Sequence, residues 1–260
     1  MALLALLSPA KTLNFDDDLT VSSPSQPTFA AEASSLANIL KKKSSKDIQK
    51  LMSVSEKIAA LNVERNKSFS KKHTNKNARA ALLAYRGDVY KGFRLDSYSK
   101  TDFNFSQKTL RIISGLYGIL KPLDLIQPYR LEMKTKLKNT KGKDLYTFWR
   151  ETLTEQTNKD ISKHKIKEII NLASVEYSKS IDLKSLDASV VNIDFKVKKG
   201  RELKTIGIYA KKARGVMANY IVKERISSSK ALLKFKEDGY QHKPKLSDSN
   251  NLVFVKSVSA

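Results

Sequence analysis

The apolar positions of the chain are spaced in two ways, and each spacing predicts a different kind of element. Residues 2–7 form an unbroken apolar run, which is typical of a buried strand. Along residues 191–197, apolar side chains alternate with polar ones, and this alternation predicts a strand with one buried face. Further strands are expected at 165–172, 203–209 and 252–255.

Other stretches show the three-to-four-residue spacing of amphipathic helices. The clearest begins after Asp144, a good N-cap, where Leu145, Phe148, Trp149 and Leu153 fall on one stripe. This stripe places the single tryptophan in the core. A second amphipathic helix opens near residue 209, and shorter helical patterns are expected at 29–43, 46–57, 62–71, 75–85 and 102–113.

The order of these elements predicts the fold class. Helices and strands follow one another without a regular strand–helix–strand rhythm, which favours an α+β fold over a doubly wound or barrel fold. Residues 21–28 are rich in serine and proline, but they are typical of a surface loop, and no segment separates two composition regimes. We therefore expect one globular domain across residues 1–260.

Composition adds a strong positive charge and excludes several kinds of chemistry. The chain has 49 Lys and Arg residues against 26 Asp and Glu residues, a formal net charge of +23, and no cysteine. Without cysteine it can form no disulfide, iron–sulfur cluster or thiol nucleophile. The excess of cations favours a polyanionic partner, with nucleic acid ahead of an anionic membrane surface. The alternative is an ordinary lysine-rich surface.

The sequence predicts neither a membrane span nor a catalytic centre. No apolar run reaches 18 residues, so we expect no membrane contact and a cytoplasmic location. The three histidines are separated, and no pattern typical of metal ligands, catalytic triads or phosphate loops occurs. We predict no cofactor, no metal site and no catalytic residue, which favours a binding protein over an enzyme.

Residues 46–69 contain the sharpest local pattern, a candidate helix–hairpin–helix. Such a module places an apolar–x–Gly–apolar–Gly hairpin between two short helices, and the glycines bring backbone amides against a phosphate. Ala60 and Asn62 stand at the two glycine positions, and Arg65 follows in the second helix. Asn tolerates a positive φ, whereas Ala fits less well. The alternative is an ordinary helical hairpin with Leu61 in the core.

Further candidate phosphate ligands lie in separated segments. Arg111 and Lys121 flank a glycine-containing turn at 114–118, from which both side chains could reach phosphates. Arg130 follows a tyrosine, a pairing that suits stacking combined with phosphate contact. Arg130 and Glu132 would project to the same face of a strand, so a mutual ion pair is the alternative.

Two more candidate sites follow predicted element boundaries. Lys11 comes directly after the first strand, a common place for site residues. Lys211, Lys212 and Arg214 open the helix that begins near residue 209. Lysines at the start of a helix oppose its dipole, so a bound anion or a nearby carboxylate is expected there.

Lys11, the turn at 114–118, Arg130 and the residues that open the helix near 209 lie in stretches that resemble the YaaA family of bacterial peroxide-stress proteins. The resemblance implies a single-domain α+β fold with a helix–hairpin–helix and a positively charged cleft. It also implies a cytosolic DNA-binding protein that protects against hydrogen peroxide and is associated with recombinational repair and with lowering free iron. Ala60 departs from the family, in which Gly can stand at that position. The similar stretches run nearly end to end, at residues 7–13, 85–90, 114–118, 122–133, 142–146, 171–177 and 209–215.

We therefore predict a non-enzymatic protein that binds DNA largely without sequence preference. Its partner would be double-stranded and branched or partly unpaired DNA, and its oligomeric state stays open. The predicted DNA contacts are Lys11, Ala60, Asn62, Arg65, Arg111, Lys121, Arg130, Lys211, Lys212 and Arg214.

Two other functions remain open. The first is an enzyme acting on a phosphorylated or nucleotide substrate, and direct iron sequestration is a third possibility that ranks lowest. Nonspecific phosphate contact needs only cations, yet the matched motifs also carry hydroxyl and carboxyl side chains. The alternative pocket would be formed by Ser8, Lys11, Glu132, Ser174, Glu176, Lys211 and Arg214.

Overall fold

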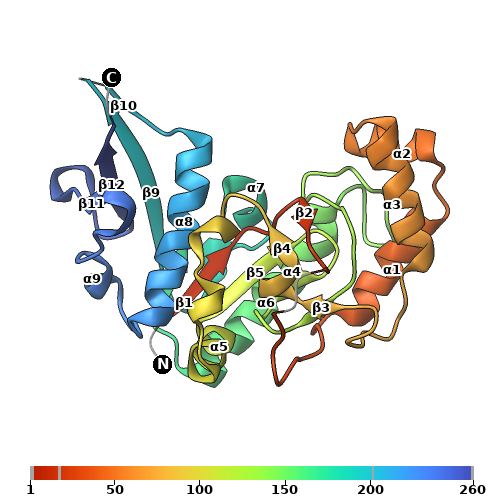
Figure 1. Cartoon of the computed structure of the whole chain (residues 1–260), viewed down its shortest axis with the longest axis horizontal. Coiled ribbons are helices and arrows are strands. Elements are labelled where there is room, and N and C mark those ends of the chain that lie inside the picture. Colours follow the sequence, from red (N-terminus) through yellow and green to blue (C-terminus); the bar gives the residue numbers. More distant parts are fainter. Residues whose placement is uncertain (1–2, 17–18, 201, 259–260) are drawn as a thin grey trace.

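The chain folds around an eight-stranded sheet with helices packed on its faces (Figure 1). The structure is a computed structural model, and it describes residues 3–16, 19–200 and 202–258. Along the sheet the strands run in the order β11-β12-β9-β8-β1-β5-β6, and β10 pairs with β9. Their bounds are β1 Leu3–Leu7, β5 Leu110–Ser114, β6 Gly118–Leu120, β8 Glu168–Asn171, β9 Ser189–Lys199, β10 Glu202–Lys204, β11 Gln241–His242 and β12 Asn251–Ser257.

The centre of the sheet is parallel, and its margins are antiparallel. β1 lies between β5 and β8, with Ala5 opposite Leu110 and Leu4 opposite Ile169. β9 and β12 continue the parallel part, whereas β6, β10 and β11 pair antiparallel. All five residues of β1 are buried, as expected of a central parallel strand covered on both faces.

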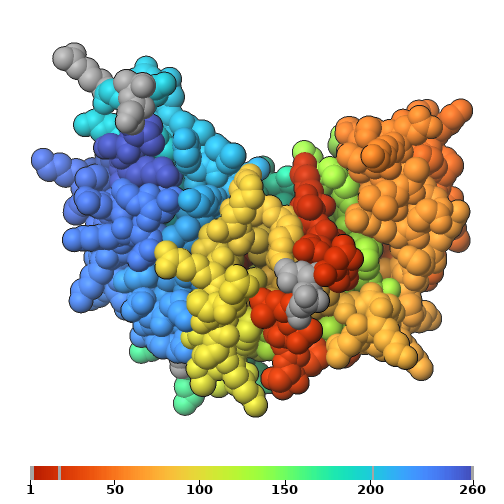
Figure 2. Space-filling view, in the orientation of Figure 1, coloured from red at the N-terminus to blue at the C-terminus, as the bar shows by residue number. Residues whose placement is uncertain are grey.

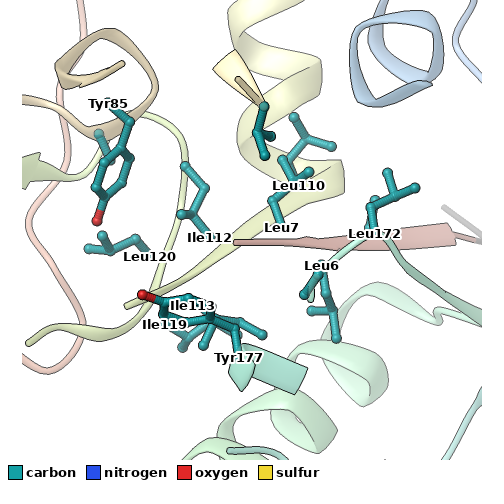
Figure 3. Packing of buried hydrophobic residues seen from close by; sticks show 14 of the residues in the cluster. Leu6, Leu7, Tyr85, Leu110, Ile112, Ile113, Ile119, Leu120, Leu172 and Tyr177 are labelled. Carbon is teal, nitrogen blue, oxygen red and sulfur yellow. The ribbon is translucent and has the colours of Figure 1, made fainter. Parts of the chain in front are cut away.

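The core on both sides of β1 is aliphatic and aromatic. Figure 3 shows Leu6 and Leu7 projecting from opposite faces of β1 into buried side chains on each side. The unbroken apolar run of the sequence is therefore a buried strand, as predicted. The mixed fold in one globular domain is confirmed, while the irregular order of elements did not predict the parallel centre.

The helices divide between the sheet and one end of the molecule. α8 packs beside β9, while α2 and α3 stand at the far end, away from the sheet (Figure 1). Two small two-stranded sheets, β2 with β4 and β3 with β7, lie between them. The helices are α1 Ala30–Lys41, α2 Ser45–Met52, α3 Glu56–Ser68, α4 Ala81–Ala84, α5 Lys100–Thr109, α6 Leu145–His164, α7 Val175–Ser178, α8 Gly207–Lys223 and α9 Ser229–Leu232. The short strands are β2 Thr12–Leu13, β3 Arg79–Ala80, β4 Tyr85–Arg86 and β7 Leu125–Ile126.

α6 begins where the sequence predicts it. The Asp144 carboxylate accepts the backbone N–H of Thr147 at 2.8 Å, which satisfies one of the unpaired amides of the first turn. Trp149 is fully buried, and its indole N–H donates to the Gly115 carbonyl at 3.0 Å. The predicted stripe and cap of this helix are both confirmed.

The predicted hairpin at residues 58–62 is wrong in position. α2 ends at Met52, its C-cap residue Ser53 has a φ of 51° in the left-handed region, and the Ser55 hydroxyl caps the start of α3. Ala60 and Asn62 consequently lie inside α3, and Asn62 donates to the Ile58 carbonyl one turn earlier at 2.7 Å. The alternative with a buried Leu61 is wrong as well, because that side chain is 50% exposed.

Three other boundaries differ from prediction. The helix expected at 102–113 ends at Thr109, and Leu110–Ser114 continues as β5 because tertiary pairing with β1 overrides the local pattern. In place of the helix expected at 75–85, the chain forms β3, the four-residue helix α4 and the first residue of β4. The strand expected at 203–209 stops at Lys204, and α8 starts at Gly207.

Candidate anion-binding groove

One face of the molecule is hollowed between α8 and the α2–α3 pair (Figure 2). Two cavities lie between these elements, and Lys11 lines both of them. The α8 pocket has a volume of about 340 Å³ and is lined by Ser8, Lys11, Arg86, Asp88, Ser174, Glu176, Lys211 and Arg214, among others. The α2 cleft has a volume of about 690 Å³ and is lined by Lys11, Lys43, Asp47, Lys50, Arg130, Glu132, Lys134 and Lys136, among others.

The α8 pocket lies where the order of the parallel strands reverses. From β1 the sheet continues to β5 on one side and to β8 on the other, so the carboxyl ends of β1 and β8 flank a topological switch point. Ser8 directly follows β1, and Ser174 lies three residues beyond β8. The Ser174 amide donates to Ser8 Oγ at 2.8 Å, and the Ser8 hydroxyl donates to Ser174 Oγ at 3.3 Å.

α8 contributes two cations to this pocket. Within the described chain, neither Lys211 nor Arg214 makes a hydrogen bond or an ion pair, and the buried Nε of Arg214 has no partner. Burial lowers the pKa of Arg214, while the charge of Asp194 on β9 opposes that shift. A guanidinium in this position lacks the paired anion that normally accompanies a cation taken out of water.

Lys212 does not belong to the α8 pocket. Its ammonium pairs with Asp238 at 3.2 Å, and it lines neither cavity. The sequence predicted a carboxylate or a bound anion near the lysines that open this helix, and Lys212 and Lys211 differ in this respect. Asp238 supplies the carboxylate for Lys212, whereas Lys211 is left facing the pocket.

Close backbone packing fixes α8 against the rim of the pocket. A Cβ on Gly215 would lie 1.6 Å from the Val89 carbonyl oxygen, and a Cβ on Gly92 would lie 2.3 Å from the Val216 amide. Only glycine permits such an approach. Arg214, the residue before Gly215, is thereby held next to the loop that contributes Asp88.

Glu132 gathers three cations between the two cavities. Its carboxylate lies 3.0 Å from Lys11 Nζ, 3.2 Å from Arg130 Nη2 and 3.6 Å from Lys134 Nζ. Burial acts to raise the pKa of Glu132, but the hydrogen bond from Lys11 and the charges of all three cations outweigh burial, so the pKa falls below its usual range. Glu132 is therefore an ionised, nearly buried carboxylate that partly neutralises Lys11 and Arg130.

Sequence reasoning missed the lysines of the α2 cleft. Lys43 and Lys50 come from the α2 side, and Lys134 and Lys136 come from the segment after Glu132. The signal that could have found the second pair is its spacing, because positions two apart in an extended segment share one side. Lys50, Lys134 and Lys136 are exposed, whereas Lys43 is half-buried, as Arg214 is.

Several predicted DNA contacts lie outside the groove. Arg111 is buried in the sheet, with its Nε 2.7 Å from Asp160 Oδ2, so the prediction that it reaches a phosphate is wrong. Lys121 is half-buried beyond β6 and lines neither cavity, and Ala60 and Asn62 also lie outside both. Arg65 lines a separate cavity of about 340 Å³, where burial and the charge of Arg130 lower its pKa.

The other predicted residues come together. Six of them line the α8 pocket, and Glu176 there also accepts the Lys134 amide at 3.3 Å. Arg130 and Glu132 lie beside the same pocket, through their contacts with each other and with Lys11. The six lining residues are Ser8, Lys11, Ser174, Glu176, Lys211 and Arg214.

Two structural findings bear on other classes of site. Within residues 3–16, 19–200 and 202–258, no group of three or more His, Cys, Asp or Glu side chains could hold a metal ion. In the same part of the chain, none of the helices combines the length and the apolar character that crossing a bilayer requires.

Comparison with known proteins agrees with the sequence resemblance. A family described as peroxide stress protein YaaA matches residues 3–246. A UPF0246 protein of Acaryochloris marina is 46% identical over 259 residues, covering 98% of this chain and 100% of its own length. UPF0246 proteins of Tolumonas auensis and Crocosphaera subtropica are 46% and 44% identical, over 97% and 98% of this chain and 97% and 100% of their own lengths. Because the family match spans residues 3–246 and includes every residue named in the groove, this chain belongs to the family of the peroxide stress protein YaaA.

Proposed function

We propose that the chain is a cytoplasmic protein of the peroxide stress response that binds DNA, largely without sequence preference, along the groove. The observation that carries the proposal is the convergence of cations from distant segments. Lys11, Arg130, Lys211 and Arg214 lie along one hollow together with the lysines of the α2 cleft. Phosphate contacts of this kind position a protein on DNA but do not read its sequence.

The turn between α2 and α3 supports a second contact with the DNA backbone. Leu51, Ser53, Val54 and Ser55 follow the apolar–x–turn–apolar–turn order of a helix–hairpin–helix, with serines where glycines usually stand. Ser53 adopts the positive φ that such a hairpin requires, and Ser55 opens α3. In this proposal the hairpin is residues 51–55 rather than 58–62, and Ser53 borders the α2 cleft.

The proposal also connects DNA binding with peroxide stress. Ferrous iron and hydrogen peroxide generate hydroxyl radicals that break DNA strands. A protein that covers double-stranded, branched or partly unpaired DNA, and that is linked to repair and to lowering free iron, would limit this damage. Membership of the family supports the stress role, and the groove supports the DNA contact.

Salt-dependent DNA binding tests this function. Fluorescence anisotropy on a duplex and on a branched DNA should show log K falling linearly with log salt, with a slope near −0.9 per phosphate neutralised. Removing Lys134 and Lys136 together should weaken binding and make that slope smaller by about two units. A control pair on α6, Lys159→Ala with Lys163→Ala, removes the same charge from two exposed positions that line neither cavity. A flat salt response, or equal effects of the two pairs, would contradict the proposal.

A second candidate function is an enzyme acting on a phosphorylated or nucleotide substrate. The observation that favours it is the meeting of Ser8, Ser174, Lys211 and Arg214 in one pocket, with the Lys11–Glu132 pair beside it. Incubation with a panel of phosphomonoesters and nucleotides, followed by chromatography, would detect a product. Product formation that disappears in Arg214→Gln supports this function. Product formation that survives the change, or no product from any compound, contradicts it.

A further inference from the structure

The α8 pocket contains a feature that binding along a DNA backbone does not require. Its two unpaired cations, Lys211 and Arg214, lie one helical turn apart on α8 and face a partly enclosed space. Exposed lysines, such as Lys50, Lys134 and Lys136 of the α2 cleft, are sufficient to meet the backbone phosphates of DNA. The half-buried Arg214 guanidinium, whose Nε has no partner, is energetically more costly than an exposed lysine, because its charge is partly desolvated without a paired anion.

Four cations and two carboxylates line the pocket, and apart from Lys211 and Arg214 each has a neighbour in the structure. The Glu176 carboxylate accepts the Lys134 amide at 3.3 Å. Lys11 is engaged by Glu132 at 3.0 Å, and Asp88 lies 3.4 Å from Lys91 Nζ. The Arg86 guanidinium donates to the carbonyls of Leu83 and Tyr85. What remains is a positive excess on the α8 side of the pocket.

The opposite side of the pocket offers hydroxyl groups. Ser8 and Ser174 line it from the ends of β1 and β8, and because the Ser8 hydroxyl donates to Ser174 Oγ, the Ser174 hydroxyl is the one whose proton remains free. A phosphate fits such a set, because its oxygens accept from a guanidinium fork, an ammonium and a hydroxyl group at once. The volume of about 340 Å³ suits a small ligand or a single nucleotide and is too small for a duplex.

We propose that the α8 pocket binds a phosphate monoester, with Arg214 and Lys211 holding the phosphate against the serine side of the pocket. A monoester phosphate carries close to two negative charges at neutral pH, which matches two unpaired cations better than the single charge of a backbone phosphodiester. The phosphate belongs either to a free small molecule or to the 5′ end of a DNA strand lying in the groove. This inference shares its pocket with the second candidate function but rests neither on turnover nor on duplex binding.

Calorimetric titration tests the site directly. The probes are inorganic phosphate, a nucleoside 5′-monophosphate and the corresponding nucleoside. We expect the monophosphate to bind and the nucleoside not to bind. Arg214→Gln and Lys211→Gln should each weaken monophosphate binding about tenfold or more, the effect of one charge-assisted hydrogen bond. The monophosphate affinity of Arg214→Lys should lie between those of the wild type and Arg214→Gln, because lysine keeps the charge but lacks the planar set of N–H donors of the guanidinium.

Lys212→Gln is the matched control. It lies on the same helix between the two tested positions, is paired with Asp238 and lines neither cavity, so monophosphate affinity should stay unchanged. Thermal melts of every variant verify folding. The proposal is overturned if phosphate and monophosphate fail to bind the folded wild type, or if Lys212→Gln weakens binding as much as Arg214→Gln.

A second arm identifies the source of the phosphate. Two oligonucleotides of one sequence are compared, one with a 5′-phosphate and one with a 5′-hydroxyl. If the pocket takes a DNA end, the phosphorylated strand binds more tightly and Arg214→Gln removes the difference. If it takes a free small molecule, the mononucleotide binds while the two oligonucleotides bind alike. Loss of DNA binding on removal of Lys134 and Lys136, with monophosphate binding intact, separates the groove proposal from this one.

Discussion

Arg111 and Arg214 are two arginines taken out of water in opposite ways. Arg111 lies on β5 in the centre of the sheet, paired with Asp160 and donating also to the carbonyls of Gln107 and Leu110. Arg214 lies on α8, which packs beside β9, and makes no hydrogen bond or ion pair with the described residues. Each guanidinium keeps one buried nitrogen without a hydrogen-bond partner, Nη2 in Arg111 and Nε in Arg214. The difference is the ion pair, because the first charge has a carboxylate within the fold and the second does not.

This difference gives a rule for reading a strongly basic chain. A cation that has its own carboxylate contributes to stability, and a cation held without one indicates a ligand. Net charge cannot distinguish the two, because Arg111 and Arg214 count equally in a total of +23. The following changes test whether the two sites behave as differently as their contacts indicate.

The largest effect is expected at the buried pair. Asp160→Asn leaves the Arg111 guanidinium buried without a counter-charge and should lower the free energy of unfolding by about 3–5 kcal/mol. Denaturation with urea measures the loss. Arg214→Gln, which removes a cation that has no internal partner, should change stability by less than about 1 kcal/mol. Equal losses in the two variants would break the comparison.

The next effect is expected where α8 meets the rim of the pocket. Gly215→Ala places a methyl group on the Val89 carbonyl, so α8 has to move and stability should fall by about 1–3 kcal/mol. The same movement displaces Lys211 and Arg214 and should weaken phosphate binding. Gly207→Ala is the control, because no atom lies within 4 Å of its added Cβ on the same helix. An unaltered melting temperature for Gly215→Ala would contradict the packing argument.

Arg225, which pairs with Asp102, is expected to show an effect of intermediate size that depends on pH. Burial acts to raise the pKa of Asp102, but hydrogen bonds from Ser99, Arg225 and Lys223 outweigh it and hold that pKa well below its usual range. A depressed carboxyl pKa stabilises the fold above the unfolded-state value of about 4, and this contribution is lost as pH falls toward the folded-state value. Asp102→Asn should therefore cost about 1.5 kcal/mol at pH 7 and less at pH 3. Urea titrations at both pH values measure the difference, and a loss that is independent of pH would contradict it.

The smallest effect is expected at an exposed pair. Lys67 and Glu64 are one turn apart on α3, 3.1 Å from each other, with side chains 62% and 71% exposed. Lys67→Ala should alter the free energy of unfolding by at most about 0.5 kcal/mol, because water and salt screen such a pair. A thermal melt that shows a loss comparable to that of Asp160→Asn would mean that exposure does not separate the two kinds of cation.

The sequence predicted the parts of the fold that local chemistry determines. The apolar run of β1, the Asp144 cap and the stripe around Trp149 all depend on neighbours a few residues away. The boundary at Thr109 was missed, because pairing of Leu110 with β1 decides it from over a hundred residues away. The sequence predicted the turn between these two helices at 58–62 instead of at Ser53, because serines rather than glycines occupy the actual turn.

The sequence predicted which residues belong to the candidate site, but it did not predict how they are arranged in space. Ser8, Lys11, Ser174, Lys211 and Arg214 could be selected as polar residues in the matched motifs. No spacing rule shows that the first and the last of them share one pocket. The same limitation explains the wrong prediction for Arg111, because only the fold brings Asp160 to it.

The position of β1 has a consequence for how the chain folds as it is synthesised. β1 is made before its two neighbours in the sheet, β5 and β8, which begin at Leu110 and Glu168, more than a hundred residues further along the chain. Until both have left the ribosome, a strand of five buried residues lacks its native partners, and long-range pairing of this kind is slow and prone to aggregation. Nascent chains that do not yet include β8 are therefore natural clients for chaperones, and the groove can assemble only after α8 has followed.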